Sequence, residues 1–290
     1  MPGWRFVLNR RWFGYLAMAI VFAIACYFLA QWQFARRDEA IAAIAKVQNN
    51  YDRAPQPLPD VVPALASFRA ADEWTPVEAT GTYLVQDQLL VRNRPYGGNP
   101  GFEVLTPLRL SNGSIFIVDR GWVPIGNDQD TPDSVPAPPG GLVKVDARLQ
   151  PSEPDLPGRS APSGQVATIN LPTVQKLLGT ATYTGAYGLL SKESPSVAVR
   201  PAPAVKPTLD EGPHLSYALQ WFAFAIFGFF GLGWAIRQEY RHLNADDPDE
   251  RARALARRKK AQAKAPTDAD IEDAILDGSE DAVLDGSATR

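Results

Sequence analysis

The chain has 290 residues, of which 29 are Lys or Arg and 32 are Asp or Glu, so its formal net charge is -3. This balance argues against nucleic acid as a partner, because proteins that bind nucleic acid carry a surplus of basic charge. The sole cysteine, Cys26, lies inside an apolar run, which excludes a disulfide within the chain and any cysteine-based zinc, iron–sulfur or copper site.

An uncharged apolar run from Trp12 to Trp32 is the first element. As a helix it is about 31 Å long, at about 1.5 Å per residue, which is enough to cross a bilayer. The run is longer than the core of a signal peptide, and its exit at Gln31–Phe34 is bulky, so we expect an uncleaved anchor. The alanine-rich pattern from Asp38 to Tyr51 predicts that the helix continues beyond the membrane.

The region that follows is polar and rich in proline. Prolines from Pro55 to Pro63 are expected to end regular structure and form a stiff connector. Short β-branched and aromatic runs, separated by turn signals, then predict strands at Pro76–Tyr83, Gln88–Arg94, Phe102–Leu110, Ser114–Val118, Leu142–Leu149, Tyr183–Leu190 and Ser196–Arg200. Ser111–Gly113 predicts a tight hairpin, and Pro172 in a first turn predicts a short helix over Leu171–Leu178.

A second apolar run, Leu215–Ile236, is long enough to cross a bilayer, and a basic segment follows it. Arginines also precede the first run, so the preference of basic flanks for the cytoplasm predicts that both termini are cytoplasmic. Arg251–Lys260 holds six basic residues in ten, which is typical of a solvated helix and also permits contact with anionic membrane lipid. The acidic stretch 268–285 cannot bury a core, and we expect it to be disordered.

Together these elements predict a membrane α+β protein of the cell membrane. Two transmembrane helices flank a mostly antiparallel β domain outside the cytoplasm, a small barrel or sandwich with one or two helices. The expected segments are a cytoplasmic N-terminus (1–11), a first transmembrane helix (12–34), the extracytoplasmic domain (35–213), a second transmembrane helix (214–236) and a cytoplasmic tail (237–290) that is basic and then acidic and disordered.

Small residues form a stripe along each apolar run and predict that the two helices pack closely. The first stripe is Ala19, Ala23, Cys26 and Ala30, and the second is Ala225, Gly228, Gly231 and Ala235. Small side chains let membrane helices approach each other. Alanine is also simply abundant in this chain, so the pattern alone does not decide the question.

A catalytic site of the Ser-His-Asp type is disfavoured, because it needs a histidine inside the folded domain and the chain offers only His214, at the membrane edge, and His242, on the cytoplasmic side. His214 is instead the candidate ligand of this sequence. It opens the second apolar run, and Tyr217 and Trp221 follow it on one helical face. A helix N-terminus disfavours added positive charge, so we expect a neutral imidazole, the form that binds metals, including haem iron.

The exit of the first run brings further candidates to the same expected depth. Trp32 supplies an aromatic wall, and Arg36 and Arg37 supply guanidinium groups that suit haem propionates. Spacing alone favours the alternative interpretation, because Trp, Tyr, His and Arg also anchor helices at membrane interfaces in proteins that bind no cofactor.

Several separated stretches resemble one family. They are Leu29–Gln33 followed by Arg36 and Arg37, "NRPYGGNPGFEVLTPLRL" from Asn93, "VDRGWVP" from Val118 and "HLSYALQWFAF" from His214. In this order they are similar to the surfeit-locus-one family of cytochrome c oxidase assembly factors, over about the first 240 residues. Ala30 stands where the family usually has glycine before the tryptophan.

The resemblance implies a chaperone or cofactor-handling protein rather than an enzyme. It implies that haem a is bound transiently, with His214 at the position implicated in the family, and is inserted into the large subunit of cytochrome c oxidase. It also implies docking to that subunit or to haem a synthase, which we assign to Arg92–Phe102 and Asp119–Pro124. The alternative for these two segments is purely structural, with their glycines serving turns, Trp122 in the core and Arg120 paired near Asp119. The alternative function is a scaffold that stabilises an oxidase intermediate without touching cofactor.

Overall fold

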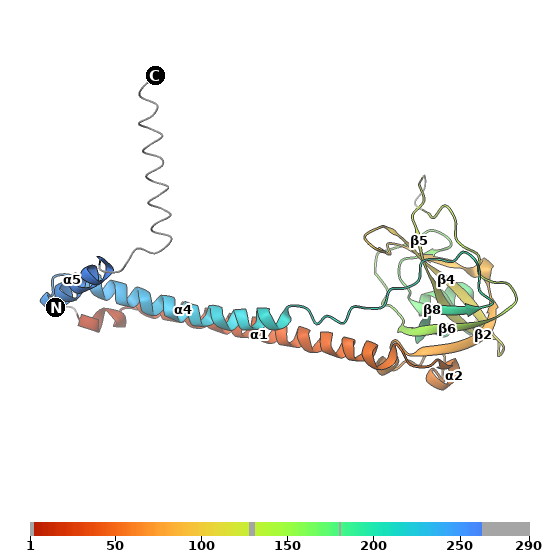
Figure 1. Cartoon of the computed structure of the whole chain (residues 1–290), viewed down its shortest axis with the longest axis horizontal. Coiled ribbons are helices and arrows are strands. Elements are labelled where there is room, and N and C mark those ends of the chain that lie inside the picture. The colour runs from red at the N-terminus through yellow and green to blue at the C-terminus, as the bar shows by residue number, and fades with distance from the viewer. Residues whose placement is uncertain (1–2, 128–130, 180, 263–290) are drawn as a thin grey trace, which may run out of the picture. The chain divides into compact units, whose positions relative to one another are not determined.

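The computed structural model describes residues 3–127, 131–179 and 181–262 and divides into two compact units (Figure 1). One unit comprises Met1–Phe34 and Leu215–Arg290, and the other comprises Ala35–His214. We describe each unit separately. The predicted acidic stretch 268–285 lies outside the described residues.

The two predicted apolar helices are α1 (Arg10–Asn50, 41 residues) and α4 (His214–Leu243, 30 residues). Both are long and apolar enough to cross a membrane, and the most apolar window of α4 has no buried residue. α1 continues without a break through the alanine-rich segment, as the sequence predicts. The predicted domain boundaries around these helices stay a prediction.

Within the helical unit, the predicted small-residue stripe is the buried side of α1. Cys26 and Ala30 are buried, and on α4 Ala218 is buried. A Cβ added at Gly228 would lie 3.3 Å from the ring of Phe22, so that glycine marks a close approach. Gly231 is exposed, so the predicted α4 stripe is wrong there. The helical repeat carries the buried face of α4 from Gly228 to the residue four positions on, Leu232.

Past Leu243 the chain turns into α5 (Pro248–Gln262), and a short 3-10 helix, η1 (Gly3–Leu8), precedes α1. The turn before α5 is held by the buried Asn244, whose side chain donates to the Tyr240 carbonyl at 2.9 Å. Arg11 of α1 also pairs with Glu239 of α4 at 2.6 Å.

The other unit is a β-barrel with short helices. Its strands are β1 (Gln56–Pro57), β2 (Pro76–Tyr83), β3 (Leu89–Val91), β4 (Gly101–Leu110), β5 (Ile115–Pro124), β6 (Leu142–Pro151), β7 (Gln165–Val166) and β8 (Ala186–Ser194). The neighbours run β2-β6-β8-β5-β4, and pairing of β4 with β2 closes these five strands into a ring (Figure 1). β1 extends the sheet beside β2, and β3 with β7 extends it beside β4.

The barrel is mixed rather than purely antiparallel. Four of its five pairings are antiparallel, as predicted, but β5 and β8 run parallel. The predicted hairpin joins β4 to β5, with Gly113 at a φ of 83°. The hydrophobic core has one cluster around Phe116 and another around Ile117, and residues of β5 are buried on both faces of the strand.

Two short α-helices, α2 (Leu58–Val61) and α3 (Leu171–Leu178), belong to this unit, together with two 3-10 turns, η2 (Ala70–Asp72) and η3 (Val85–Asp87). α3 has the predicted bounds. The Asn170 side chain accepts from the Thr173 N–H at its start, and Gly179 takes the left-handed conformation at its end.

Two sequence predictions are wrong here. The proline connector contains β1 and α2, because a proline in the first turn of a helix removes only a donor that would have no helical partner. Ser196–Arg200 is not a strand, since Pro195 follows β8 directly and the chain rejoins the sheet only at an isolated bridge between Ala202 and Trp122.

Candidate functional site

The two motif segments assigned to docking meet in one cavity of the β unit. This cavity, of about 400 Å³, is the motif pocket. Arg94 and Tyr96 come from the loop after β3, Glu103 from β4, and Asp119 and Trp122 from β5. Segments that are separate in sequence are therefore brought together because β4 pairs with β5.

Arg94 is the central cation of the motif pocket. Its Nε lies 3.0 Å from Glu103 and its Nη2 lies 2.5 Å from Glu153, just after β6. Glu153 also accepts from the Ile169 N–H at 2.9 Å. One guanidinium thus bridges two carboxylates from different elements, and the arrangement fixes the loop after β3 against the barrel.

Asp119 lies behind this ion-pair cluster and is buried. Burial, and then the nearby negative charge of Glu103, raises the pKa of Asp119 to about 8, although the carboxylate accepts the Gly121 N–H at 2.9 Å. Burial also raises the pKa of Glu103, against the effect of Arg94. Burial therefore favours the protonated form of Asp119 beside the ion pairs of Arg94.

An aromatic pair covers one side of the pocket. The rings of Tyr96 and Trp122 stack with centroids 5.2 Å apart, and the Trp122 indole donates to the Arg94 carbonyl at 2.7 Å. Gly121 has a φ of 121°, and a Cβ there would collide with the Ala202 carbonyl. Glycine is required at this position because the segment after β8 crosses so closely at Ala202.

Arg120 points to the opposite face of β5, as the two-residue period of a strand dictates. It does pair with an acid, but the acid is Glu193 of β8, at 3.2 Å, and both side chains are buried. Arg120 also donates to the Pro136 carbonyl at 2.8 Å, and Tyr83 donates to Glu193 at 3.2 Å. The expected pairing near Asp119 is therefore wrong, and Arg120 serves the barrel interior.

The lining of the motif pocket suits recognition better than covalent chemistry. Among its described residues there is no histidine, cysteine or serine, and the described part of the chain holds no metal-binding cluster of His, Cys, Asp or Glu. Its groups are a bridged guanidinium, carboxyls and an aromatic pair. Such groups can hydrogen-bond and stack against a polypeptide segment.

The six residues predicted to surround a cofactor are divided between the two units. Trp32, Tyr217 and Trp221 belong to the helical unit, whereas Arg36, Arg37 and His214 belong to the other. Trp32 and Tyr217 are exposed, with about half of each side chain free (57% and 48%). Trp221 is half-buried and contacts Phe224 edge-on. Whether these residues form one site stays a prediction.

Both predicted propionate-binding arginines hold carboxylates already. Arg36 pairs with Glu39 at 2.8 Å on the same helix, and Arg37 pairs with Glu211 at 2.9 Å. The second pair lies within the β-containing unit and links α1 to the chain three residues before His214. Arg36 and Glu39 are exposed, so this pair contributes little to stability and exchanges easily. Arg37 is only partly exposed, and the two atoms that join it to Glu211 are buried.

Comparison with known proteins gives the same family as the motifs. Residues 20–226 match the SURF1 family. The chain belongs to the SURF1 family. SURF1-like proteins of Mycobacterium bovis and of two strains of Mycobacterium tuberculosis, all described as uncharacterized, are 33% identical over 247 residues, covering 83% of this chain and 89% of theirs. The SURF1 family is associated with cytochrome oxidase assembly, and its members are assembly factors rather than known enzymes.

Sequence reasoning missed two contributors to the motif pocket of this SURF1 protein. Glu153 lies in a proline-rich stretch that read only as a break between strands, and Tyr187 lies on β8, far from both motifs in sequence. No local pattern marks either residue, because their roles depend on β8 lying between β5 and β6.

Proposed function

We propose that this SURF1 protein assists assembly of cytochrome c oxidase by holding haem a transiently and delivering it to the large subunit. The observation that carries this proposal is the family match together with the position of His214 as the first residue of a membrane-length helix. Haem a is apolar, so its passage through water is unfavourable, and a holder at the membrane edge avoids that step.

The residues present fit such a group. The imidazole of His214 is of the donor type that haem iron accepts, so His214 would hold the group if haem were bound, and the haem would supply the redox-active iron that the oxidase needs. Trp32 and Tyr217 offer exposed aromatic surface. Arg36 exchanges Glu39 for an incoming carboxylate at small cost, because one exposed ion pair replaces another, whereas Arg37 would have to leave its pair with Glu211 first.

Docking is assigned to the motif pocket. Tyr96 and Trp122 present an aromatic pair, and the charged pairs of Arg94 lie beside it. We propose that a segment of the oxidase large subunit, or of haem a synthase, stacks on this pair. Tyr96→Ala removes the half-buried ring and its hydroxyl bond to the Pro203 carbonyl but keeps the Trp122 hydrogen bond, so oxidase activity in membranes should fall while the protein stays folded, with only a small drop in thermal stability. Unchanged oxidase activity would reject docking at this surface.

The proposal places the β unit outside the cytoplasm and both termini inside. The single cysteine makes this testable. In a Cys26→Ala background, Ser160→Cys on the β unit should react with a membrane-impermeant maleimide in intact cells. Ala256→Cys on α5 should react only after lysis, since both positions are exposed and differ only in side of the membrane. The reverse labelling pattern would invert the orientation and remove the proposed route of delivery.

The ligand role of His214 is tested by visible spectroscopy. The full chain, coexpressed with the haem a pathway and purified in detergent, should carry a haem spectrum. His214→Ala should abolish the spectrum, whereas His242→Ala, which changes the other histidine of the chain, should keep it. Equal haem occupancy in His214→Ala and wild type would reject His214 as the ligand.

A scaffold that binds no cofactor is the second candidate. The motif pocket favours it, because that pocket is built from recognition groups and none of its described residues is a histidine or cysteine. This candidate predicts copurification of oxidase subunits with the wild-type chain and no haem under any expression condition. Haem bound in stoichiometric amount would eliminate it.

A further inference from the structure

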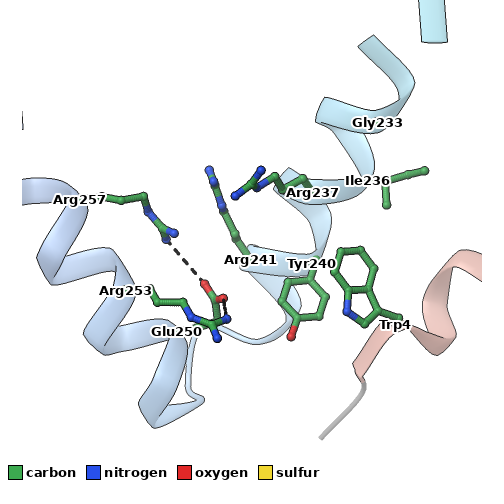
Figure 2. A pocket seen from close by; sticks show the side chains of 9 residues that line it. All are labelled: Trp4, Gly233, Ile236, Arg237, Tyr240, Arg241, Glu250, Arg253 and Arg257. Atoms are coloured by element: carbon green, nitrogen blue, oxygen red, sulfur yellow. Dashed lines mark hydrogen bonds and ion pairs between the residues drawn. The ribbon is translucent and has the colours of Figure 1, made fainter. Parts of the chain in front are cut away.

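A second cavity, of about 520 Å³, lies in the helical unit where α4 ends and α5 begins; we call it the arginine pocket. Four arginines line it: Arg237, Arg241, Arg253 and Arg257. The first two are four residues apart on α4 and the last two are four apart on α5, so each helix directs both of its arginines to one face. Figure 2 shows these side chains together with Glu250, which pairs with Arg253 and Arg257.

Positive charge in the arginine pocket exceeds negative charge. Glu250 is largely buried and lies 2.9 Å from Arg253 and 3.6 Å from Arg257. Within the described residues, neither Arg237 nor Arg241 has a carboxylate partner, and Glu250 is the sole acid of the lining. Guanidinium groups gathered at this density repel one another, so an anion between them would lower the energy of the arrangement.

An apolar groove adjoins the arginine pocket. This groove, of about 560 Å³, is lined by Ile226, Phe229, Phe230 and Trp234 and shares Gly233 and Arg237 with the arginine pocket. A Cβ added at Gly233 would meet nothing within 4 Å, so the space beside this shared lining residue is open. Arg237 follows the last apolar residue of the second run directly. A cationic cavity thus adjoins an apolar groove at the end of a membrane-length helix.

An aromatic pair marks the same level. Trp4 stacks on Tyr240 with ring centroids 4.2 Å apart, and both residues line the arginine pocket (Figure 2). Tryptophan and tyrosine collect at the depth of lipid headgroups. Phosphodiester groups lie at that depth too, and the guanidinium fork matches their oxygens with paired donors.

We propose that the arginine pocket and the groove together bind one anionic phospholipid, with the phosphate against Arg237 and Arg241 and an acyl chain along Phe229, Phe230 and Trp234. The occupant is a lipid rather than a free phosphate, because the groove adds apolar surface that only an acyl chain can cover. The site is independent of haem handling and needs only that α4 enters a bilayer.

Native mass spectrometry of the delipidated full chain tests this proposal, with phosphatidylglycerol and phosphatidylcholine as probes. Wild type should retain one phosphatidylglycerol in preference to phosphatidylcholine. Arg237→Gln with Arg241→Gln should weaken phosphatidylglycerol binding about 30-fold. This corresponds to about 2 kcal/mol for the loss of two basic residues, at about tenfold for each 1.4 kcal/mol. Arg258→Gln with Lys260→Gln removes the same charge from α5 outside the pocket and should leave the single bound lipid in place. Equal losses in both double variants would show diffuse attraction and overturn the site.

Further experiments distinguish the possible occupants of the arginine pocket. Gly233→Leu fills the space beside this residue without changing charge and should weaken phosphatidylglycerol binding. Glycerol phosphate, which lacks acyl chains, should not compete for the site. Competition by glycerol phosphate at concentrations similar to the lipid would overturn the lipid assignment. Removal of the acidic residues 263–290 should leave lipid affinity unchanged, whereas binding that appears only after this truncation would assign the pocket to the chain's own tail.

Discussion

Replacing Glu193 by Gln should destabilise the β unit severely, because it leaves the Arg120 guanidinium as an uncompensated buried charge. Arg120 and Glu193 are 1% and 5% exposed, and the ion pair between them measures 3.2 Å. Removing one partner of such a pair costs about 3–5 kcal/mol. At about 2–4 °C per kcal/mol for a domain of this size, the melting temperature should fall by about 10 °C.

The assay is thermal unfolding of the purified full chain in detergent, followed by tryptophan fluorescence. Glu39→Gln is the matched control, since it makes the same chemical change in the exposed pair with Arg36 and should shift the melting temperature by no more than about 1–2 °C. Arg120→Met combined with Glu193→Leu should recover part of the loss, because no charge is then buried. Recovery is incomplete, since the Pro136 carbonyl loses its donor. Equal shifts for Glu193→Gln and Glu39→Gln would refute the reasoning.

Two further predictions concern β5. The folded-state pKa of Asp119, about 8, lies above that of an unfolded aspartate, so the folded chain binds the extra proton and stability should decline as pH rises from about 4 to about 8. Asp119→Asn keeps the acceptor for the Gly121 N–H, and its free energy of unfolding should differ less between pH 6 and pH 8.5 in denaturant titrations. If the difference between the two pH values is the same as in wild type, the pH dependence comes from other groups. Gly121→Ala should lower the free energy of unfolding by more than about 2 kcal/mol, because its Cβ collides with the Ala202 carbonyl. Gly98→Ala is the control, since it is also at positive φ but in open space and should cost only about 1 kcal/mol of backbone strain. Equal melting temperatures for the two variants would contradict the collision.

The sequence predicts elements whose signals are local. β2 has its predicted bounds because apolar residues alternate along it, and α3 does because Asn170, Pro172 and Gly179 mark its two ends. The two apolar helices follow from length and composition alone. The parallel pairing of β5 with β8 has no local signal, because it depends on how a long proline-rich segment returns to the barrel.

The candidate sites divide in the same way. The two motif segments are neighbours in one hairpin, so their meeting at Arg94, Glu103 and Trp122 could be expected once the hairpin was predicted. Glu153 and Glu193 come from strands and loops placed by the barrel's closure, and no spacing rule relates them to the motifs. The arginine pocket was visible in sequence only as basic charge, since the turn held by Asn244 decides that α5 faces Arg237.

Within the motif on β5, some residues stabilise the barrel and others line the motif pocket. Asp119 and Trp122 contribute to the motif pocket, while Arg120 between them enters the barrel and neutralises Glu193. Loss of oxidase activity in an Arg120 variant would therefore follow from unfolding, with less protein and a lower melting temperature. Loss in a Tyr96 variant should occur at nearly full abundance and with only a small drop in melting temperature, because that half-buried ring gives up one stacking contact and one hydrogen bond to Pro203. Measuring abundance and activity together thus distinguishes the residues that build the barrel from those that meet the partner.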